Sequence, residues 1–412
     1  MAKKKEEILD DITTDDNIID ELVIENRTVY PTGFRNIDTN IANRVFDENT
    51  DMVIQTNRGV LSGSMITLIG NSHTGKSTLL FQILGNMIRP FVKAKDTRVK
   101  VHIFDVENGV NMNRLKFLTN FIDTEIASHF IQKIDLAIED LKNLVTNEIE
   151  TKKKLKPDVI TGTQGHKTEV YYPTFIVVDA ISEMLPRESL DITNEDSNTM
   201  YMRQILELDK FFKRYKSYFV KYNINLLTVA HISKKIEMGA MPNQRPAREW
   251  RGLPSDMKIN GGKILQYNTD IGIFLAKIEA VDTKSVEKKG GTYLNADSII
   301  ESRLFKNRQG LDNTTFYLVQ DAEVAFNPLK SFLYECAQFK ILEAAGAVRK
   351  LDGYGTVRSQ DIINKFLNES EFRRTLYINY DKYKENILNS SKRTSEERVR
   401  VDALIDLMYE EV

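Results

Sequence analysis

Residues 70–77 read GNSHTGKS and fit the phosphate-binding pattern G-x-x-x-x-G-K-[ST] at every defined position. The apolar run LSGSMITLIG (61–70) precedes them and predicts a buried strand, whereas TLLFQILGNMI (78–88) follows with apolar residues at helical spacing. A strand, a Gly-rich turn and a helix in this order are the context in which the motif is specific. Backbone N–H groups of such a loop bind phosphates together with the helix N-terminus, so the stretch predicts a nucleotide-binding α/β fold.

Each position of this loop has an expected task toward ATP and Mg²⁺. Lys76 is expected to neutralise the β- and γ-phosphates, and the Ser77 hydroxyl is expected to complete the magnesium coordination. The residues expected to bind the nucleotide through this loop are Gly70, Asn71, Ser72, His73, Thr74, Gly75, Lys76, Ser77 and Thr78.

Further strands and helices alternate along the chain after this loop. Apolar runs predict strands at 101–107, 172–180 and 223–231, and helical patterns lie near 112–122, 131–153 and 197–221. Later runs at 269–278, 295–307 and 313–320 favour hairpin-type strands that extend the sheet, while the polar stretch 154–171 predicts a loop insertion. This alternation predicts a mainly parallel sheet flanked by helices.

Polar side chains end three of the predicted strands. Asp179 ends the run FIVVD and is expected to hold the water shell of Mg²⁺; the alternative is a helix-capping role before Ser182. Glu107 ends VHIFDVE, where a carboxylate can polarise the attacking water. Asp105, two residues earlier on the same predicted strand, is the alternative for that role. His231 ends NINLLTVAH, where it can sense the γ-phosphate.

A basic stretch with Gly and Pro breakers, residues 232–262, follows His231. Its cations and the sole tryptophan suit phosphate neutralisation and base stacking with single-stranded DNA, and a solvated surface loop is the plainer alternative. The candidate nucleic-acid contacts in this stretch are Lys234, Lys235, Arg245, Arg248, Trp250, Arg251 and Lys258.

Two further cations, Lys306 and Arg308, follow the predicted strand IIESRLF. They bracket one residue, so they point to the same side of a strand and could reach a phosphate bound to a neighbouring subunit. A solvated strand end is the alternative. No other site competes with these motifs, because the histidines lack metal-ligand spacing and no G-x-S-x-G elbow occurs.

Composition excludes several classes of protein. Lys and Arg number 57 and Asp and Glu 59 among 412 residues, a formal net charge of −2, which excludes a uniformly basic coat for nucleic acid. The single cysteine, Cys336, excludes an intrachain disulfide and favours a reducing compartment. The sequence lacks a secretory h-region and any run of about 18 apolar residues, so we expect a cytoplasmic protein without a membrane partner.

Changes in composition and in hydrophobic pattern along the chain predict four segments. They are an N-terminal arm as a candidate subunit contact (1–29), a nucleotide-binding core (30–327), a small helical C-terminal domain (328–390) and an amphipathic acidic tail (391–412).

In this order the motifs resemble the RecA-type strand-exchange recombinases, and most closely their phage UvsX branch. The resemblance spans about residues 30–390 and rests on GNSHTGKS, FDVENGV, IVVDAISEMLP, VAHISKK, GGKILQY and FKNR, with LEAAGAVRKLDGYG and IINKFLNESEFRR similar to the C-terminal region of the family. It implies a RecA-like P-loop NTPase core and a DNA-dependent ATPase that catalyses strand exchange in DNA recombination and repair.

The resemblance also implies roles for individual residues. Glu107 matches the catalytic glutamate and His231 the γ-phosphate sensor of the family. Residues 187–199, which begin with Arg187, match the first DNA-binding loop, although this stretch is acidic here. Ile236 falls where the family wedges an aliphatic side chain between base triplets. The remaining matches are the second DNA-binding loop at 232–261, and Lys306 and Arg308 as the cations that reach the neighbour's ATP.

The implied partners are single-stranded DNA, homologous duplex DNA, further copies of the chain in a helical filament, and loader and single-strand-binding proteins. The implied location is the nucleoid, or the host cytoplasm for a virus. Two alternatives stay open: a DnaB-type hexameric helicase, which shares the core and a basic motif like FKNRQG, and an ATP-gated DNA-binding scaffold with little turnover. Residues 123–171 and 278–297 are longer than in the family, and the arm lacks the expected basic helix.

Overall fold

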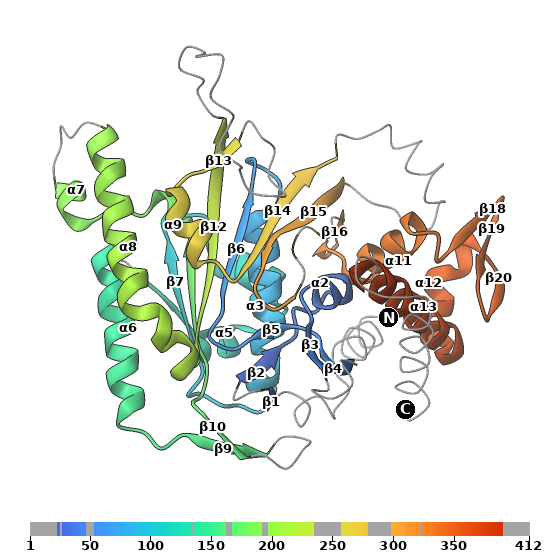
Figure 1. Ribbon diagram of the computed structural model, residues 1–412, viewed down its shortest axis with the longest axis horizontal. Helices are drawn as coiled ribbons and strands as arrows, with labels where there is room; N and C mark the ends of the chain where they lie inside the picture. Colours follow the sequence, from blue (N-terminus) through green and yellow to red (C-terminus); the bar gives the residue numbers. More distant parts are fainter. Residues whose placement is uncertain are drawn as a thin grey trace.

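The computed structural model describes residues 23–24, 27–46, 53–133, 136–161, 167–191, 197–234, 257–278, 298–310, 312, 314–321 and 323–389. Within this part of the chain the fold is α/β, with a large, mostly parallel central sheet flanked by helices (Figure 1). The sequence therefore predicted the fold class correctly.

Ten of the described strands form the central sheet, in the order β17-β16-β15-β14-β6-β12-β11-β7-β8, with β13 paired to β12. Strands β14, β6, β12, β11, β7 and β8 run parallel, and β15, β16 and β17 extend one side antiparallel. The bounds are β6 Met65–Gly70, β7 Lys100–Asp105, β8 Phe130–Gln132, β11 Thr174–Asp179, β12 Ile224–Lys234, β13 Met257–Ile259, β14 Ile271–Lys277, β15 Ser298–Asn307, β16 Thr315–Asp321 and β17 Ala325–Phe326.

Two helical layers cover the two faces of this sheet. Alternate residues of β6 show the division: Ile66 and Leu68 pack with α3 and α4, whereas Met65 and Ile69 pack with α6 and α8. In Figure 1 α6 and α8 stand side by side along one face and α3 lies behind the sheet. None of the described helices combines the length and the apolar character that crossing a bilayer would require.

The helices that flank the core confirm the predicted helical patterns, with one strand added. Residues 130–132 form β8 at the edge of the sheet, where a helix was predicted to begin near 131. The bounds are α2 Arg35–Asn40, α3 Lys76–Lys93, α4 Met112–Thr119, α5 Asp123–His129, α6 Ile138–Lys153, η1 Ile181–Glu183, α7 Arg187–Asp191, α8 Ser197–Lys221 and α9 Gly262–Asn268.

Short hairpins lie outside the central sheet. The N-terminal strands β1 (Val23–Ile24), β2 (Arg27–Tyr30) and β5 (Val60–Leu61) form one small sheet, and β3 (Asn43–Phe46) pairs with β4 (Val53–Asn57). The prediction of a plain loop over 154–171 is wrong, because β9 (Asp158–Thr161) pairs antiparallel with β10 (Lys167–Val170). Cross-strand backbone hydrogen bonds hold these short polar strands, whose sequence carries no apolar alternation.

The C-terminal region contains three strands as well as helices, whereas the sequence predicted a mostly helical domain. Strands β18 (Glu343–Ala345), β19 (Val348–Leu351) and β20 (Gly355–Arg358) form a three-stranded antiparallel sheet between α11 (Pro328–Gln338) and the helices α12 (Ile362–Asn368) and α13 (Ser370–Asn389), with η2 at Ser359–Asp361. Its apolar core includes Ile299 and Val319 of the central sheet, so the two parts pack against each other.

A buried ionic network joins this region to the N-terminal segment. The Glu335 carboxylate, fully buried, lies 2.5 Å from Lys384 Nζ and accepts hydrogen bonds from Tyr380 (2.9 Å) and Asn36 (3.2 Å). Asp381 pairs with both Arg35 and Arg58, at 2.8 Å and 2.6 Å. The buried Asp381 carboxylate therefore fastens α13 to Arg35 of α2 and to Arg58, whose guanidinium groups stay partly exposed.

We expect Glu335→Ala to lower the free energy of unfolding by about 3–5 kcal/mol, because Lys384 would stay buried without its carboxylate. Urea denaturation followed by circular dichroism measures this loss. Glu343→Ala is the matched control, since Glu343 is exposed on β18 and its removal should change the free energy by less than about 0.5 kcal/mol. Equal free energies of unfolding for the two variants would contradict a stabilising role of the buried Glu335–Lys384 pair.

Candidate active site

The phosphate loop begins where β6 ends, between β12 and β14. A Cβ on Gly70 would lie 2.5 Å from the carbonyl oxygen of Leu275, so only glycine fits at this strand end. Gly75 precedes α3 with φ 81°, the left-handed region that favours glycine, and a Cβ there would lie 2.4 Å from Gln320 Nε2. Close packing of the neighbouring strands thus fixes the path of the loop.

Lys76 points back into this loop. Its Nζ donates a hydrogen bond to the Asn71 carbonyl oxygen at 2.9 Å, and Thr74 Oγ1 donates to the same oxygen at 2.9 Å. Burial lowers the pKa of Lys76, while the carboxylates of Glu107 and Asp179 act in the opposite direction. The loop therefore holds a cation between two carboxylates.

Asp179 ends β11 beside the loop and is 2 % exposed. Burial raises the pKa of its carboxyl group; a hydrogen bond from Ser77 opposes the rise, and the nearby charge of Glu107 adds to it. Its Oδ1 atom is buried with no hydrogen-bond partner among the described residues. Mg²⁺ prefers oxygen ligands, and the unpaired Asp179 carboxylate oxygen and the Ser77 hydroxyl are such ligands. Asp179 and Ser77 therefore fit the predicted metal role.

The described residues contain no group of three or more His, Cys, Asp or Glu side chains placed to hold a metal ion. Ser77 and Asp179 would therefore hold magnesium together with phosphate oxygens and water, which is the usual mode for this ion.

Asp105 and Glu107, the two alternatives for the water-activating acid, have different surroundings. Asp105 is 2 % exposed, and its two carboxylate oxygens accept the N–H groups of Gly109 (3.0 Å) and Val110 (2.8 Å). Asp105 therefore holds the turn after β7. The Glu107 side chain is 39 % exposed and acts electrostatically on Lys76 of the phosphate loop.

His231 contacts this glutamate directly. Its Nε2 atom meets Glu107 Oε1, although β12 and β7 are separated by β11 in the sheet. His231 is paired with Gly70 in the β12–β6 register, and its backbone N–H donates to Ser182 Oγ at 3.1 Å. The structure therefore brings together Lys76, Asp179, Glu107 and His231, which the sequence predicted from four separate strand ends.

Two residues of this site, Arg114 and Gln204, carry no motif in the sequence. Arg114 donates to the Gly109 carbonyl oxygen at 2.6 Å and counteracts the raised pKa of Asp179. Gln204 of α8 donates to the carbonyl oxygens of Ser182 and Met184, both at 2.9 Å. These contacts fix the turns that follow β7 and β11, and only the fold reveals them.

Lys306 and Arg308 lie away from the phosphate loop of the same chain. Lys306 Nζ donates to the carbonyl oxygens of Gln266 (2.7 Å) and Tyr267 (2.8 Å) at the end of α9. Arg308 lies 3.1 Å from Asp270, whose other oxygen accepts the N–H of Met65 at the start of β6. The strand β6 spans about 16 Å at 3.3 Å per residue, so these cations lie at its opposite end from Gly70.

Burial and the neighbouring guanidinium of Arg308 lower the pKa of Lys306 to about 8. Arg308 remains 52 % exposed, so it can contact a second molecule.

The candidate DNA contacts are described only in part. Arg187 pairs with Asp140 at the exposed start of α7, and Lys258 is exposed on β13, which pairs with the end of β12. Lys234 is the last residue of β12. The other candidates, Lys235, Ile236, Arg245, Arg248, Trp250 and Arg251, lie outside the described residues. Within the described chain, β12 thus leads from His231 directly into the predicted DNA-binding segment.

Neither the protein-family models nor the curated proteins contain a match to this chain.

Proposed function

We propose that the chain is an ATP-dependent recombination protein of the RecA type that forms filaments on single-stranded DNA and pairs it with homologous duplex DNA. The observation that carries the proposal is that the residues expected to act on ATP lie at two opposite ends of the sheet. Lys76, Asp179, Glu107 and His231 meet at the carboxyl end of the parallel strands, whereas Arg308 lies at the other end of β6. A second copy could supply that cation.

The chemistry of the proposed ATPase follows from the residues that meet. Glu107 is the exposed carboxylate, so it accepts the proton of the attacking water, while Asp105 keeps its turn in place. Lys76 neutralises the β- and γ-phosphates. Magnesium, when bound, supplies charge neutralisation at the phosphate oxygens, and Ser77 and Asp179 would hold it. Arg308 of a neighbouring copy stabilises the charge that develops on the transferred phosphoryl group.

His231 supports a link between this chemistry and DNA binding. Its ring contacts Glu107, and the strand that carries it continues for three residues to Lys234. A bound γ-phosphate competes with Glu107 for the imidazole, so nucleotide state shifts the end of β12. ATP therefore favours the form that grips DNA, and ADP releases it.

Electron microscopy with single-stranded DNA and ATP tests the proposal. Long helical filaments are expected. Closed six-membered rings would select the DnaB-type helicase instead. DNA binding without DNA-stimulated ATP hydrolysis would select the ATP-gated scaffold. The exposed Glu107 beside Lys76 favours turnover over the scaffold.

The segment 232–261 is expected to bind DNA mainly through phosphate contacts. Binding of single-stranded DNA should weaken with salt, and replacing Lys234, Lys235, Arg248 and Arg251 by alanine should flatten the log-affinity against log-salt slope by about 0.7 per cation. Fluorescence of Trp250, the sole tryptophan, should change when DNA is added with ATP. Replacing the exposed Lys340 and Lys350 by alanine is the control and should leave the slope unchanged. An unaltered slope in the fourfold variant would remove this segment from DNA binding.

A further inference from the structure

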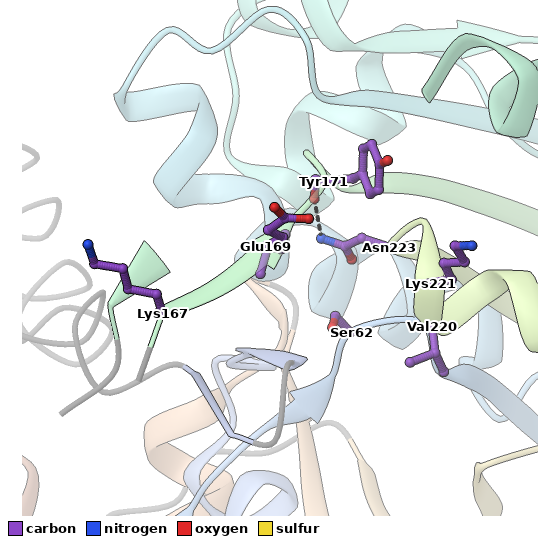
Figure 2. Close-up of a pocket in the computed structure, with 8 residues that line it drawn as sticks. Ser62, Lys167, Glu169, Tyr171, Val220, Lys221 and Asn223 are labelled. Carbon is purple, nitrogen blue, oxygen red and sulfur yellow. Dashed lines mark hydrogen bonds between the residues drawn. The ribbon is translucent and has the colours of Figure 1, made fainter. Parts of the chain in front are cut away.

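A cavity of about 320 Å³ lies at the end of the sheet opposite to the phosphate loop (Figure 2). Its lining comes from the β9–β10 hairpin, from the end of α8 and from the turn before β6: Ser62, Lys167, Glu169, Val170, Tyr171, Val220, Lys221 and Asn223. Asn223 Nδ2 donates to the Tyr171 carbonyl oxygen at 2.9 Å, the dashed line in Figure 2, and fixes the hairpin against α8. A hydrogen bond thus joins two sides of the cavity.

Apolar side chains are exposed around this cavity. Val159 pairs with Glu169 across the hairpin, so both side chains point to the face that lines the cavity. Val159 is 55 % exposed, Val220 43 % and Tyr218 39 %. We call the surface formed by Val159, Lys167, Glu169, Val220 and Lys221 the hairpin face.

Four exposed lysines lie on the hairpin face or close to it in the sequence. Lys154, Lys156, Lys167 and Lys221 are exposed and have no ion-pair partner among the described residues, whereas the neighbouring Lys153 pairs with Glu150. Exposed aliphatic side chains within a rim of lysines fit an acidic peptide segment that also carries apolar residues. Val159 and Val220 offer aliphatic contacts that suit such a segment, whereas bases of a nucleic acid would stack on the neighbouring Tyr171 and Tyr218.

The chain contains a segment of this composition. Residues 6–22 carry eight acidic side chains and no basic one, and they include six aliphatic residues (Ile8, Leu9, Ile12, Ile18, Ile19 and Leu22). Their charge is thus complementary to the lysines, and their aliphatic residues suit Val159 and Val220.

The described chain leaves the fold beside the same cavity. Its first strand, β1, starts at Val23 and turns into β2, where Arg27 Nε donates to the Ser62 carbonyl oxygen at 2.8 Å. Ser62 lines the cavity. A segment tethered this close has an effective concentration of about millimolar, which exceeds that of a second copy in dilute solution. We propose that residues 6–22 bind to the hairpin face of their own copy through ion pairs with its lysines.

Zero-length carbodiimide cross-linking of the full chain tests this docking, because it joins contacting carboxylates and lysines without altering the sequence. Equal amounts of ¹⁴N- and ¹⁵N-labelled chain are mixed and cross-linked at low concentration. Peptides that join residues 6–22 to Lys154, Lys156, Lys167 or Lys221 are expected, with both halves of one isotope. Mixed-isotope peptides would place the arm on another copy and overturn the proposal, as would the absence of these peptides.

Charge reversal provides the matched variants. Lys167→Glu with Lys221→Glu should reduce the cross-links to the remaining Lys154 and Lys156 about two- to thirtyfold, since each exposed ion pair contributes roughly 0.2–1 kcal/mol. Lys340→Glu with Lys350→Glu, two exposed lysines of the C-terminal region, should leave them unchanged. Adding Asp15→Lys, Asp16→Lys and Asp20→Lys to the first pair should restore the cross-links, because the reversed charges attract each other again and still pair an amine with a carboxylate.

Two results of these measurements would remove the proposal. One is an unchanged cross-link yield in the Lys167→Glu, Lys221→Glu variant. The other concerns acetylation of the four lysines. If an added oligothymidylate protects them and the arm does not, the hairpin face is a nucleic-acid surface. Neither result depends on ATP hydrolysis, so the proposed function can stand or fall separately.

Discussion

Glu107→Gln is expected to bind ATP as the unaltered chain does and to hydrolyse it about 10²–10⁴-fold more slowly. The amide keeps the shape of the side chain and can still contact His231, but it cannot accept a proton from water. Phosphate release at saturating ATP measures the loss, and fluorescent-nucleotide binding measures the retained affinity. A partly exposed carboxylate beside Lys76, which makes no turn-holding hydrogen bonds of the kind that Asp105 accepts, is the physical reason for choosing this residue.

Two controls separate chemistry from folding. Glu371→Gln changes an exposed acid on α13 and should leave hydrolysis unchanged. Asp105→Asn should lower stability, because it weakens the hydrogen bonds to the N–H groups of Gly109 and Val110. Hydrolysis at the unaltered rate by Glu107→Gln would falsify the assignment of the proton acceptor.

Arg308→Ala is expected to bind ATP but to lose DNA-stimulated hydrolysis by about 10³–10⁵-fold, the range known for cations supplied in trans. Lys76→Ala should lose nucleotide binding itself. An equal mixture of the two inactive proteins should recover about a quarter of the unaltered activity, because random head-to-tail assembly pairs intact halves at that frequency. The recovery follows from the position of Arg308 at the opposite end of β6 from Gly70.

Arg303→Ala is the matched control for this experiment. Arg303 lies on β15, the strand that ends one residue before Arg308; it is 42 % exposed and pairs with Glu301 at 3.3 Å, so its loss should leave hydrolysis intact. Asp270 keeps Lys216 as a partner in Arg308→Ala, and the fold should therefore survive. A mixture that stays inactive although both variants assemble on DNA would contradict a shared site, and so would full activity of Arg308→Ala alone.

The buried strands and the phosphate loop could be predicted because their signals are local. Continuous apolar runs such as Phe175–Val178 and the Gly-rich turn at 70–77 need no knowledge of the rest of the chain. The choice between Asp105 and Glu107 could not be made from the strand pattern, because side chains two residues apart on a strand point to the same face. The two amide hydrogen bonds to Asp105 depend on the turn that follows the strand.

Long-range contacts explain the remaining differences. The contact between His231 and Glu107 joins residues 124 positions apart, and its register depends on which strands neighbour β11. The hairpin at 158–170 and the small sheet at 343–358 were missed because their strands are three or four residues long and have few apolar side chains. Backbone pairing, rather than side-chain pattern, holds such strands.

The ionic fastening of α13 to α2 has a consequence for synthesis on the ribosome. Arg35 and Asp381, which form one of its pairs, are 346 positions apart in the chain. At about 5–20 residues per second, roughly 17–70 s pass between the emergence of the first partner and the second. During that interval the face of α2 that later meets α13 remains uncovered, and the nascent chain cannot complete its last packing step. Chaperone dependence of expression should therefore be greater for chains that end before Asp381 than for the full chain.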